Sequence, residues 1–147
     1  MATYILSKRA NVDEGGQTGN NPLELACTLG DKNMAALLLA HNATMEKAPK
    51  ALLHAARNGF IEIMQMLLDH GANVNAHPYG TYTTVAQQRG SECWGSVLHC
   101  ATGKGHTEAV RFLLKKDSAK EYKNMLDMTA LDLAKKLGNA EIVRLLQ

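Results

Sequence analysis

Apolar and polar positions along the chain repeat in four pairs of short segments. The first member of each pair ends in glycine and carries leucine and alanine at matching places; these members are residues 21–30, 50–59, 96–105 and 129–138. The second member is more continuously apolar and covers residues 34–39, 63–68, 109–114 and 142–146. Such self-similarity indicates a repeat protein, in which each unit buries its apolar face against its neighbours.

The second pair predicts two helices joined by a tight turn. Three residues of the first segment share one helical face, at spacings i, i+3 and i+4: Leu52, Ala55 and Ala56. We expect Gly59 to end this helix, because glycine adopts the left-handed backbone at little cost. The next predicted helix covers residues 62–69 and is ended by Gly71. Its apolar side consists of Ile63, Met66 and Leu67.

Several stretches resemble the ankyrin repeat pattern, Thr-Pro-Leu-His-x-Ala-Ala-x-x-Gly-His-x-Glu-Ile-Val-x-Leu-Leu-Leu-x-x-Gly-Ala-Asp-Val-Asn. The resemblance is carried by residues 52–56, 59–75 and 97–114 and extends over nearly the whole chain. It implies an all-α solenoid of stacked helix-turn-helix pairs with short β-hairpin fingers. We expect about four repeats plus a leading partial repeat, within one ankyrin repeat domain over residues 1–147.

The expected boundaries divide this domain into six parts. They are a partial repeat at 1–17, repeats at 18–46 and 47–79, an insertion in a finger at 80–95, a repeat at 96–125 and a truncated terminal repeat at 126–147. The chain therefore opens and closes inside repeats. Because terminal repeats need polar outer faces, we expect this chain to be a fragment of a longer array.

The repeat spacing is irregular at two places. The glycines that close the first segments lie 29, 46 and 33 residues apart, whereas ankyrin repeats have a period of about 33. The short interval replaces the usual finger with Lys47–Pro49, so we expect no full hairpin there. The long interval adds an insertion before Ser96. In the last finger Asp127 replaces the turn glycine, and aspartate tolerates a left-handed backbone better than most residues.

The insertion concentrates the aromatic side chains of a chain that has few. The stretch between Asn75 and Ser96, which includes the insertion, holds Tyr79, Tyr82 and Trp94, the last being the only tryptophan. Tyrosine and tryptophan are enriched at the energetic centres of interfaces, so the insertion is a candidate binding element. The alternative is that it folds back and Trp94 covers the neighbouring helices, as tryptophan is largely buried on average.

A second candidate surface follows from the resemblance, which implies that the two residues before each first-helix glycine face the concave side. These positions include Arg57, Asn58, Lys104 and Lys136. Three cations in a row favour an acidic partner and a salt-sensitive association rate. The alternative is that they are ordinary solvated side chains. Asn75 also resembles the ankyrin asparagine that is hydroxylated in some animal proteins, although it could simply fix its hairpin turn.

Composition excludes several classes. A net charge of +2 does not argue for nucleic acid or an anionic membrane. The longest apolar run is far shorter than a membrane span of roughly 20 residues, and no secretory signal is seen. Three cysteines at irregular spacing do not form a disulfide framework and fit a reducing compartment, so we expect cytoplasmic or nuclear location.

The residues offer little chemistry for catalysis. His77, Cys93, His99 and Cys100 are close in sequence but lack metal-ligand spacing. The resemblance instead implies that His99 hydrogen-bonds the backbone of the neighbouring finger, and Cys27 replaces a core alanine. We therefore expect no catalytic residues, no metal and no cofactor.

The sequence predicts a monomeric, non-enzymatic module that binds a protein partner across its concave face and fingers. One alternative is that the array targets a larger protein, for example a bacterial effector acting in the host cytoplasm, whose activity lies elsewhere. A less favoured alternative is a nucleotide or oligonucleotide sensor, with Trp94 or Tyr79 as a stacking platform.

Overall fold

A computed structural model describes residues 12–13, 21–76 and 95–147. In these ranges the regular secondary structure is helical apart from one isolated β-bridge, and the helices form four consecutive pairs. They are α2 (Pro22–Leu29), α3 (Lys32–Ala40), α4 (Ala51–Asn58), α5 (Ile61–Asp69), α7 (Val97–Gly103), α8 (Thr107–Lys115), α9 (Ala130–Lys136) and α10 (Ala140–Leu146). The predictions made for Tyr79, Tyr82, Trp94, His77 and Cys93 lie outside the described residues.

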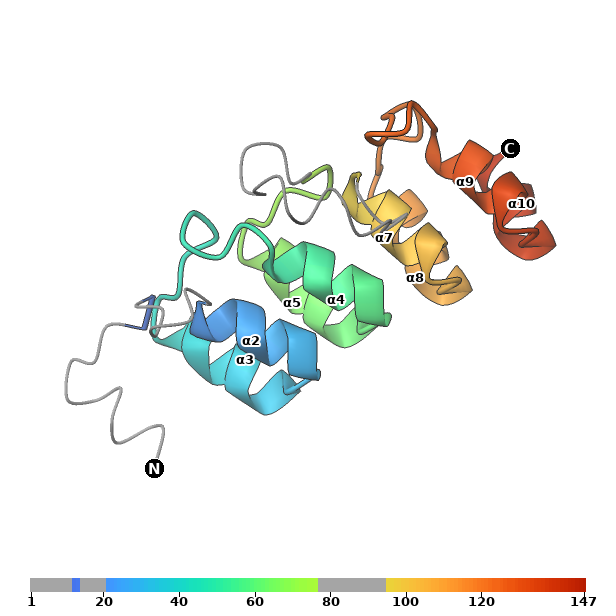
Figure 1. The fold of residues 1–147 in the computed structure, drawn as a ribbon. Helices are drawn as coiled ribbons and strands as arrows, with labels where there is room; N and C mark the ends of the chain where they lie inside the picture. The colour runs from blue at the N-terminus through green and yellow to red at the C-terminus, as the bar shows by residue number, and fades with distance from the viewer. Residues whose placement is uncertain (1–11, 14–20, 77–94) are drawn as a thin grey trace.

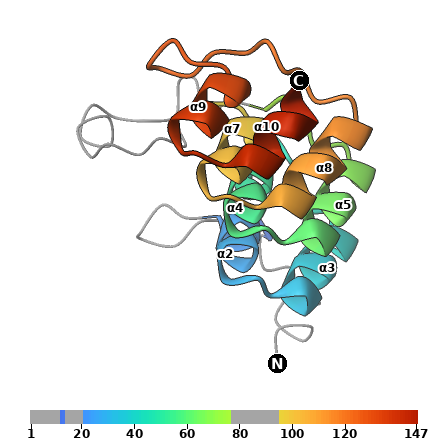
Figure 2. The same cartoon turned by 90° about the vertical axis from the view of Figure 1, so that its right-hand side faces the viewer.

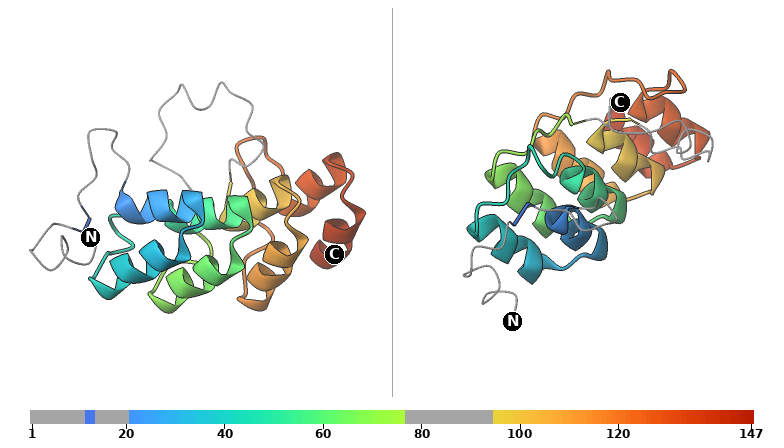
Figure 3. Two further views of the ribbon diagram at one scale, coloured as in Figure 1. Left: turned by 90° about the horizontal axis from the view of Figure 1, so that it is seen from below. Right: turned by 60° about the vertical axis from the view of Figure 1, so that its left-hand side comes forward.

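The pairs stack side by side and produce two rows of helices (Figures 1 and 2). The first helices α2, α4, α7 and α9 form one row, and the second helices α3, α5, α8 and α10 form the other. The described connections, after α3 and after α8, emerge from the same end of the pairs (Figures 1 and 3). This is the all-α solenoid that the sequence predicts.

A left-handed glycine closes each first helix and reverses the chain. Gly30, Gly59, Gly105 and Gly138 have φ between 71° and 76°, which confirms the turn predicted at Gly59. At Gly30 a close contact adds to the backbone requirement. A Cβ atom there would lie only 2.6 Å from the Phe60 ring of the next pair. The turn is therefore also a packing contact between neighbouring units.

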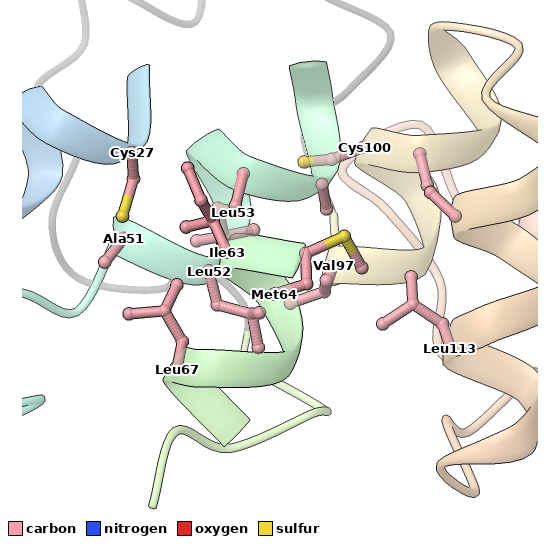
Figure 4. Close-up of a cluster of buried hydrophobic side chains, with 14 of the residues drawn as sticks. Cys27, Ala51, Leu52, Leu53, Ile63, Met64, Leu67, Val97, Cys100 and Leu113 are labelled. Atoms are coloured by element: carbon pink, nitrogen blue, oxygen red, sulfur yellow. The ribbon is translucent and has the colours of Figure 1, made fainter. Parts of the chain in front are cut away.

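Small side chains allow the rows to approach closely. Ala26, Ala55, Ala101 and Ala134 occupy equivalent places in the four first helices, and all are buried. Cys27 is fully buried beside Ala26, as predicted (Figure 4). Larger apolar side chains from the second helices fill the space between the rows, including Leu67 and Leu113 (Figure 4).

The buried face of α5 differs from the expected one by a single residue. Ile63, Met64 and Leu67 are buried, whereas Met66 is only partly buried. The helix also begins at Ile61 rather than at residue 62. Met66 still packs against the core from its edge, and the predicted apolar side lacked Met64, which is fully buried.

The two described connections that differ most are those after α3 and after α8. After α3 the chain turns at once, with the Lys47 and Ala48 amides both donating to the Thr44 carbonyl, and then enters α4. After α8 it forms a hairpin with an antiparallel bridge between Lys123 and Thr129. Asp127 in this hairpin has φ 59°, which confirms the left-handed turn predicted there.

Candidate protein-binding surface

The predicted cationic residues lie at the carboxyl ends of successive first helices. Arg57 and Asn58 end α4, Lys104 caps α7 and Lys136 ends α9, and all four are exposed. Because α4 packs on α7 and α7 on α9, these side chains follow one another along the row shown in Figure 2. Neighbouring packed helices are about 8–10 Å apart, which sets the approximate spacing of the charges.

The position of these cations also has a structural benefit. Backbone carbonyls at a helix carboxyl end carry partial negative charge, so nearby cations stabilise the helix. Asn58 is tied to the backbone, since its amide donates to the His54 carbonyl at 3.0 Å and to the Thr28 carbonyl of the preceding pair at 3.4 Å. Asn58 therefore joins two units, whereas Arg57 and Lys104 extend from the row as exposed charges.

Apolar side chains extend this surface at its α2 end. Leu25 and Leu29 are separated by one helical turn, and 48% and 70% of their surfaces are exposed. Leu137 is exposed in the same way at the α9 end. Leu29 and Leu137 directly precede Gly30 and Gly138, at the same place as Asn58 before Gly59. Neither they nor Leu25 were among the residues predicted to bind. The i, i+4 spacing of the two leucines was the signal for this patch.

His54 does not add charge to the row. It is half-buried on α4, one turn before Arg57 and Asn58. Burial lowers its pKa, an effect that Glu24 opposes and that Lys50 and Arg57 reinforce. The imidazole is therefore neutral at pH 7, and the positive charge of the surface comes from lysine and arginine.

The histidine predicted to bind the neighbouring finger does so. His99 Nε2 lies 3.0 Å from the Met128 carbonyl oxygen, and since a carbonyl only accepts, Nε2 carries the proton. Nδ1 then accepts from the Ser96 amide at 3.2 Å. Burial lowers the pKa of His99, which keeps it neutral. Both ring nitrogens are thus used in structure, which leaves none for a metal.

Glu24 occupies the place of His99 in the first pair. Its carboxylate accepts from the Lys50 amide at 2.9 Å, at the start of the next unit. His106 makes a further link, donating from Nε2 to the Arg57 carbonyl at 3.0 Å. Polar side chains therefore bond the backbone of adjacent units at several levels of the stack.

Asn75 has a structural role other than the one considered from sequence. Its side-chain oxygen accepts from the Ala119 amide at 2.8 Å, in the connection of the next unit. The local turn is instead held by Asn73, whose side-chain oxygen accepts from the Asn75 amide at 2.9 Å. Asn75 thus links two connections rather than fixing its own turn. Its hydroxylation remains a prediction.

The described residues show no cluster of three or more histidine, cysteine or carboxylate side chains that could hold a metal. Cys27 and Cys100 are buried thiols. Burial, with a smaller effect of Glu24, raises the pKa of Cys27 to about 12, so it is not a nucleophile at neutral pH. None of the helices in the described ranges has the length and apolar character needed to span a membrane.

Comparison with known proteins identifies the family. A family model described as "Ankyrin repeats (3 copies)" matches residues 1–78 and 76–147. The fruit fly (Drosophila melanogaster) ankyrin repeat and KH domain-containing protein mask is 37% identical over 109 residues, which cover 71% of this chain and 2% of that protein. The mouse (Mus musculus) B-cell lymphoma 3 protein homolog is 31% identical over 131 residues, 86% of this chain and 26% of that protein.

A plant relative has a different overall description. The probable E3 ubiquitin-protein ligase XBOS34 of rice (Oryza sativa subsp. japonica) is 32% identical over 96 residues, 65% of this chain and 17% of that protein. The chain thus spans about a quarter or less of these relatives' lengths. The family match extends over both halves of the chain and agrees with the stacked helix pairs. This chain belongs to the ankyrin repeat family.

Proposed function

We propose that the chain binds an acidic segment of a protein partner along the exposed ends of α4, α7 and α9. Ankyrin repeats are protein-protein interaction modules, and this membership supports a binding role. The observation that carries the proposal is the row of exposed cations, Arg57, Lys104 and Lys136, on three successive helices. Charges arranged in this way steer an oppositely charged partner and fix its register.

The apolar end of the surface narrows the partner chemistry. Leu25 and Leu29 are exposed on α2, next to the basic part of the row. A partner with acidic residues followed by an apolar side chain matches this order. Burying the two leucines contributes affinity, because removing apolar surface from water stabilises a complex by about 25 cal/mol per Å². The acidic residues contribute mainly association rate and specificity.

Charge reversal tests the row. In capture from lysate with quantitative mass spectrometry, the double variant Arg57→Glu and Lys104→Glu is expected to lose the partners that the unchanged chain retains. A matched control reverses Lys115 and Arg144, which are exposed on the second-helix row. The row is refuted as the binding surface if the double variant of Arg57 and Lys104 still captures the partners and the control variant of Lys115 and Arg144 does not.

The aromatic insertion is tested separately. Tyr79, Tyr82 and Trp94 form the second predicted contact of the same partner. Replacing Trp94 with alanine is expected to weaken capture without changing the circular dichroism spectrum. An unchanged partner list would remove the insertion from the proposed surface and leave the helix row in place.

A second proposal is that the array selects partners for a longer protein. The small share of each relative that this chain spans favours it. An antibody raised against the array would then detect an endogenous protein much larger than 16.0 kDa. Detection of a single band near that mass would overturn this second proposal without affecting the first.

A further inference from the structure

A hollow beside the shortened connection is not used by the proposed surface. Its volume is about 290 Å³, near the lower end of the range for ligand pockets. It is lined mainly by apolar side chains of the connection after α3, the start of α4 and the connection after α5: Met45, Ala48, Pro49, Leu52, Ala72 and Ala76. The hollow can hold one or two side chains, and it is too small for a large cofactor.

At two other places in the array, a side chain of one connection bonds the backbone of the next connection. Asp13 and Asn75 occupy equivalent positions, each after the same Ala-Asn-Val sequence. The Asp13 carboxylate accepts from the Thr44 amide at 3.1 Å, and Asn75 accepts from the Ala119 amide at 2.8 Å. Thr44 and Ala119 are themselves equivalent, since each lies two residues after a left-handed residue, Asn42 or Asp117. We call this hydrogen bond the connection clamp.

The clamp is missing at the hollow. Here Glu46 has the position of Asn75, and Asn73 has the position of Ala119. Within the described part of the chain, the Asn73 amide has no acceptor, although Asn73 and Glu46 both line the hollow. The cause is the short connection, because the turn closed by the Thr44 carbonyl replaces the longer path that the connection after α8 follows.

We propose that this hollow binds an extended segment of the protein partner, which inserts one uncharged apolar side chain and accepts a hydrogen bond from the Asn73 amide. The inference rests on the proposed protein-binding function and adds a second contact to it. The acceptor follows from the two intact clamps, where an oxygen occupies this place. Extended peptides that bind proteins commonly accept such hydrogen bonds with their main-chain carbonyls.

Charge also favours an uncharged apolar side chain. The rim and adjoining connection carry one acid and one base, Glu46 and Lys47, both exposed, so their charges largely cancel. The lining offers apolar surface to the inserted side chain and no buried counter-ion. A lysine or glutamate side chain would lose hydration against the apolar lining, with only the solvent-exposed charges of the rim nearby, whereas leucine or methionine carries no charge to desolvate.

The test uses a minimal extended probe and nuclear magnetic resonance of the ¹⁵N-labelled chain. N-acetyl-leucine N-methylamide offers one apolar side chain and two carbonyl acceptors. We expect it to shift the Asn73 amide resonance with millimolar affinity, as for a small fragment. The glycine analogue, which lacks the side chain, and the lysine analogue, which adds charge, are expected to bind at least about tenfold more weakly.

Variants of the lining decide the location. Ala76→Leu fills the hollow and is expected to abolish the Asn73 shift, with Ala72→Val as a smaller change should the first variant unfold. Ala140→Leu, at an exposed position of α10, is the matched control and should bind the probe normally. The proposal is overturned if no probe shifts Asn73, or if Ala76→Leu binds as tightly as the unchanged chain.

Two further variants test whether Glu46 accepts the hydrogen bond of the Asn73 amide and whether the hollow binds the probe independently of the cationic row. If Glu46→Ala by itself removes a hydrogen bond from the Asn73 amide in solution, Glu46 closes the clamp and the proposal is overturned. The double variant of Arg57 and Lys104 should leave the probe shift unchanged. Suppose that the double variant loses its partners and that the probe shifts Asn73 in neither the variant nor the unchanged chain. Binding at the hollow would then be disproved, and binding along the cationic row would be retained.

Discussion

The connections after α3 and α8 begin alike and then diverge. Each starts with a left-handed residue, Asn42 or Asp117, and each next places a buried small residue, Ala43 or Ser118, against the core. In the longer connection the Ala119 amide donates to Asn75 Oδ1, and the hairpin that follows accepts a hydrogen bond from His99 Nε2 at the Met128 carbonyl. The shorter one turns directly into its helix and leaves a hollow.

The helices and the connections hold neighbouring units together in different ways. The helix rows pack in the same manner on both sides of the short connection, with buried alanines at matching places. The polar links between units, in contrast, depend on connection length. A few missing residues therefore change hydrogen bonding between units while leaving the apolar stack intact.

The largest expected effect is at the long connection. Replacing His99 with alanine leaves the Met128 carbonyl and the Ser96 amide without their partner and creates a cavity, which should cost about 3 kcal/mol of unfolding free energy. The matched change at the short connection, Glu24→Ala, should cost about half as much because it removes a single bond to Lys50. Urea unfolding measures both, and equal losses would contradict the comparison.

The connection clamp should give the next largest difference. Asn75→Ala leaves the Ala119 amide unsatisfied and should destabilise the chain by about 1.5 kcal/mol. Glu46→Ala, at the equivalent position, should change the unfolding free energy by less than about 0.5 kcal/mol. The prediction fails if the two substitutions have similar effects in urea.

Acid should weaken the array through its buried histidine. Burial lowers the folded-state pKa of His99 below its ordinary value of 6.5, so the unfolded chain binds the proton first. This contribution to stability is therefore greatest above pH 6.5 and is lost as the pH falls through and below 6.5. His99→Gln should flatten this part of the profile, and His54, whose pKa is also lowered, accounts for part of any remaining slope.

The smallest effects should come from the shared start of the two connections. Asn42→Gly and Asp117→Gly each remove a side chain from a left-handed backbone and should stabilise by about 0.5 kcal/mol. Asp117→Gly should gain slightly more, because a carboxylate at a helix carboxyl end is unfavourable. Thermal unfolding of both variants would show whether the two connections do begin under equal strain.

Much of the fold could be predicted because local chemistry determines it. The glycine turns, the buried alanines and the left-handed Asp127 each follow from a residue type at a repeated place. Met64 was not predicted to be buried, because the i, i+3, i+4 spacing from Ile63 selects Met66 and Leu67, whereas packing on both helix rows also buries the residue next to Ile63. The partners of Asn75 and Glu24 required the stack itself, since the bonds join residues in different units.

The candidate site was only partly accessible from sequence. Exposure of Arg57, Lys104 and Lys136 follows from their place before each glycine, and the structure agrees. The exposed Leu25 was overlooked because leucine in an apolar repeat suggests core. The hollow could not be predicted, because a shorter connection can either draw the units together or leave space between them.

The missing clamp also bears on how the array comes apart. In a linear stack each unit touches only its neighbours, so stability is a sum of unit and junction terms, and unfolding spreads from the weakest junction. The α2–α3 pair lies on one side of that junction and the remaining pairs on the other. The packing of α2 on α4 and the hydrogen bonds of Glu24 and Asn58 still join the two parts. Unfolding should therefore be less cooperative across this junction than with a clamp, and a partner segment seated there would raise the cooperativity.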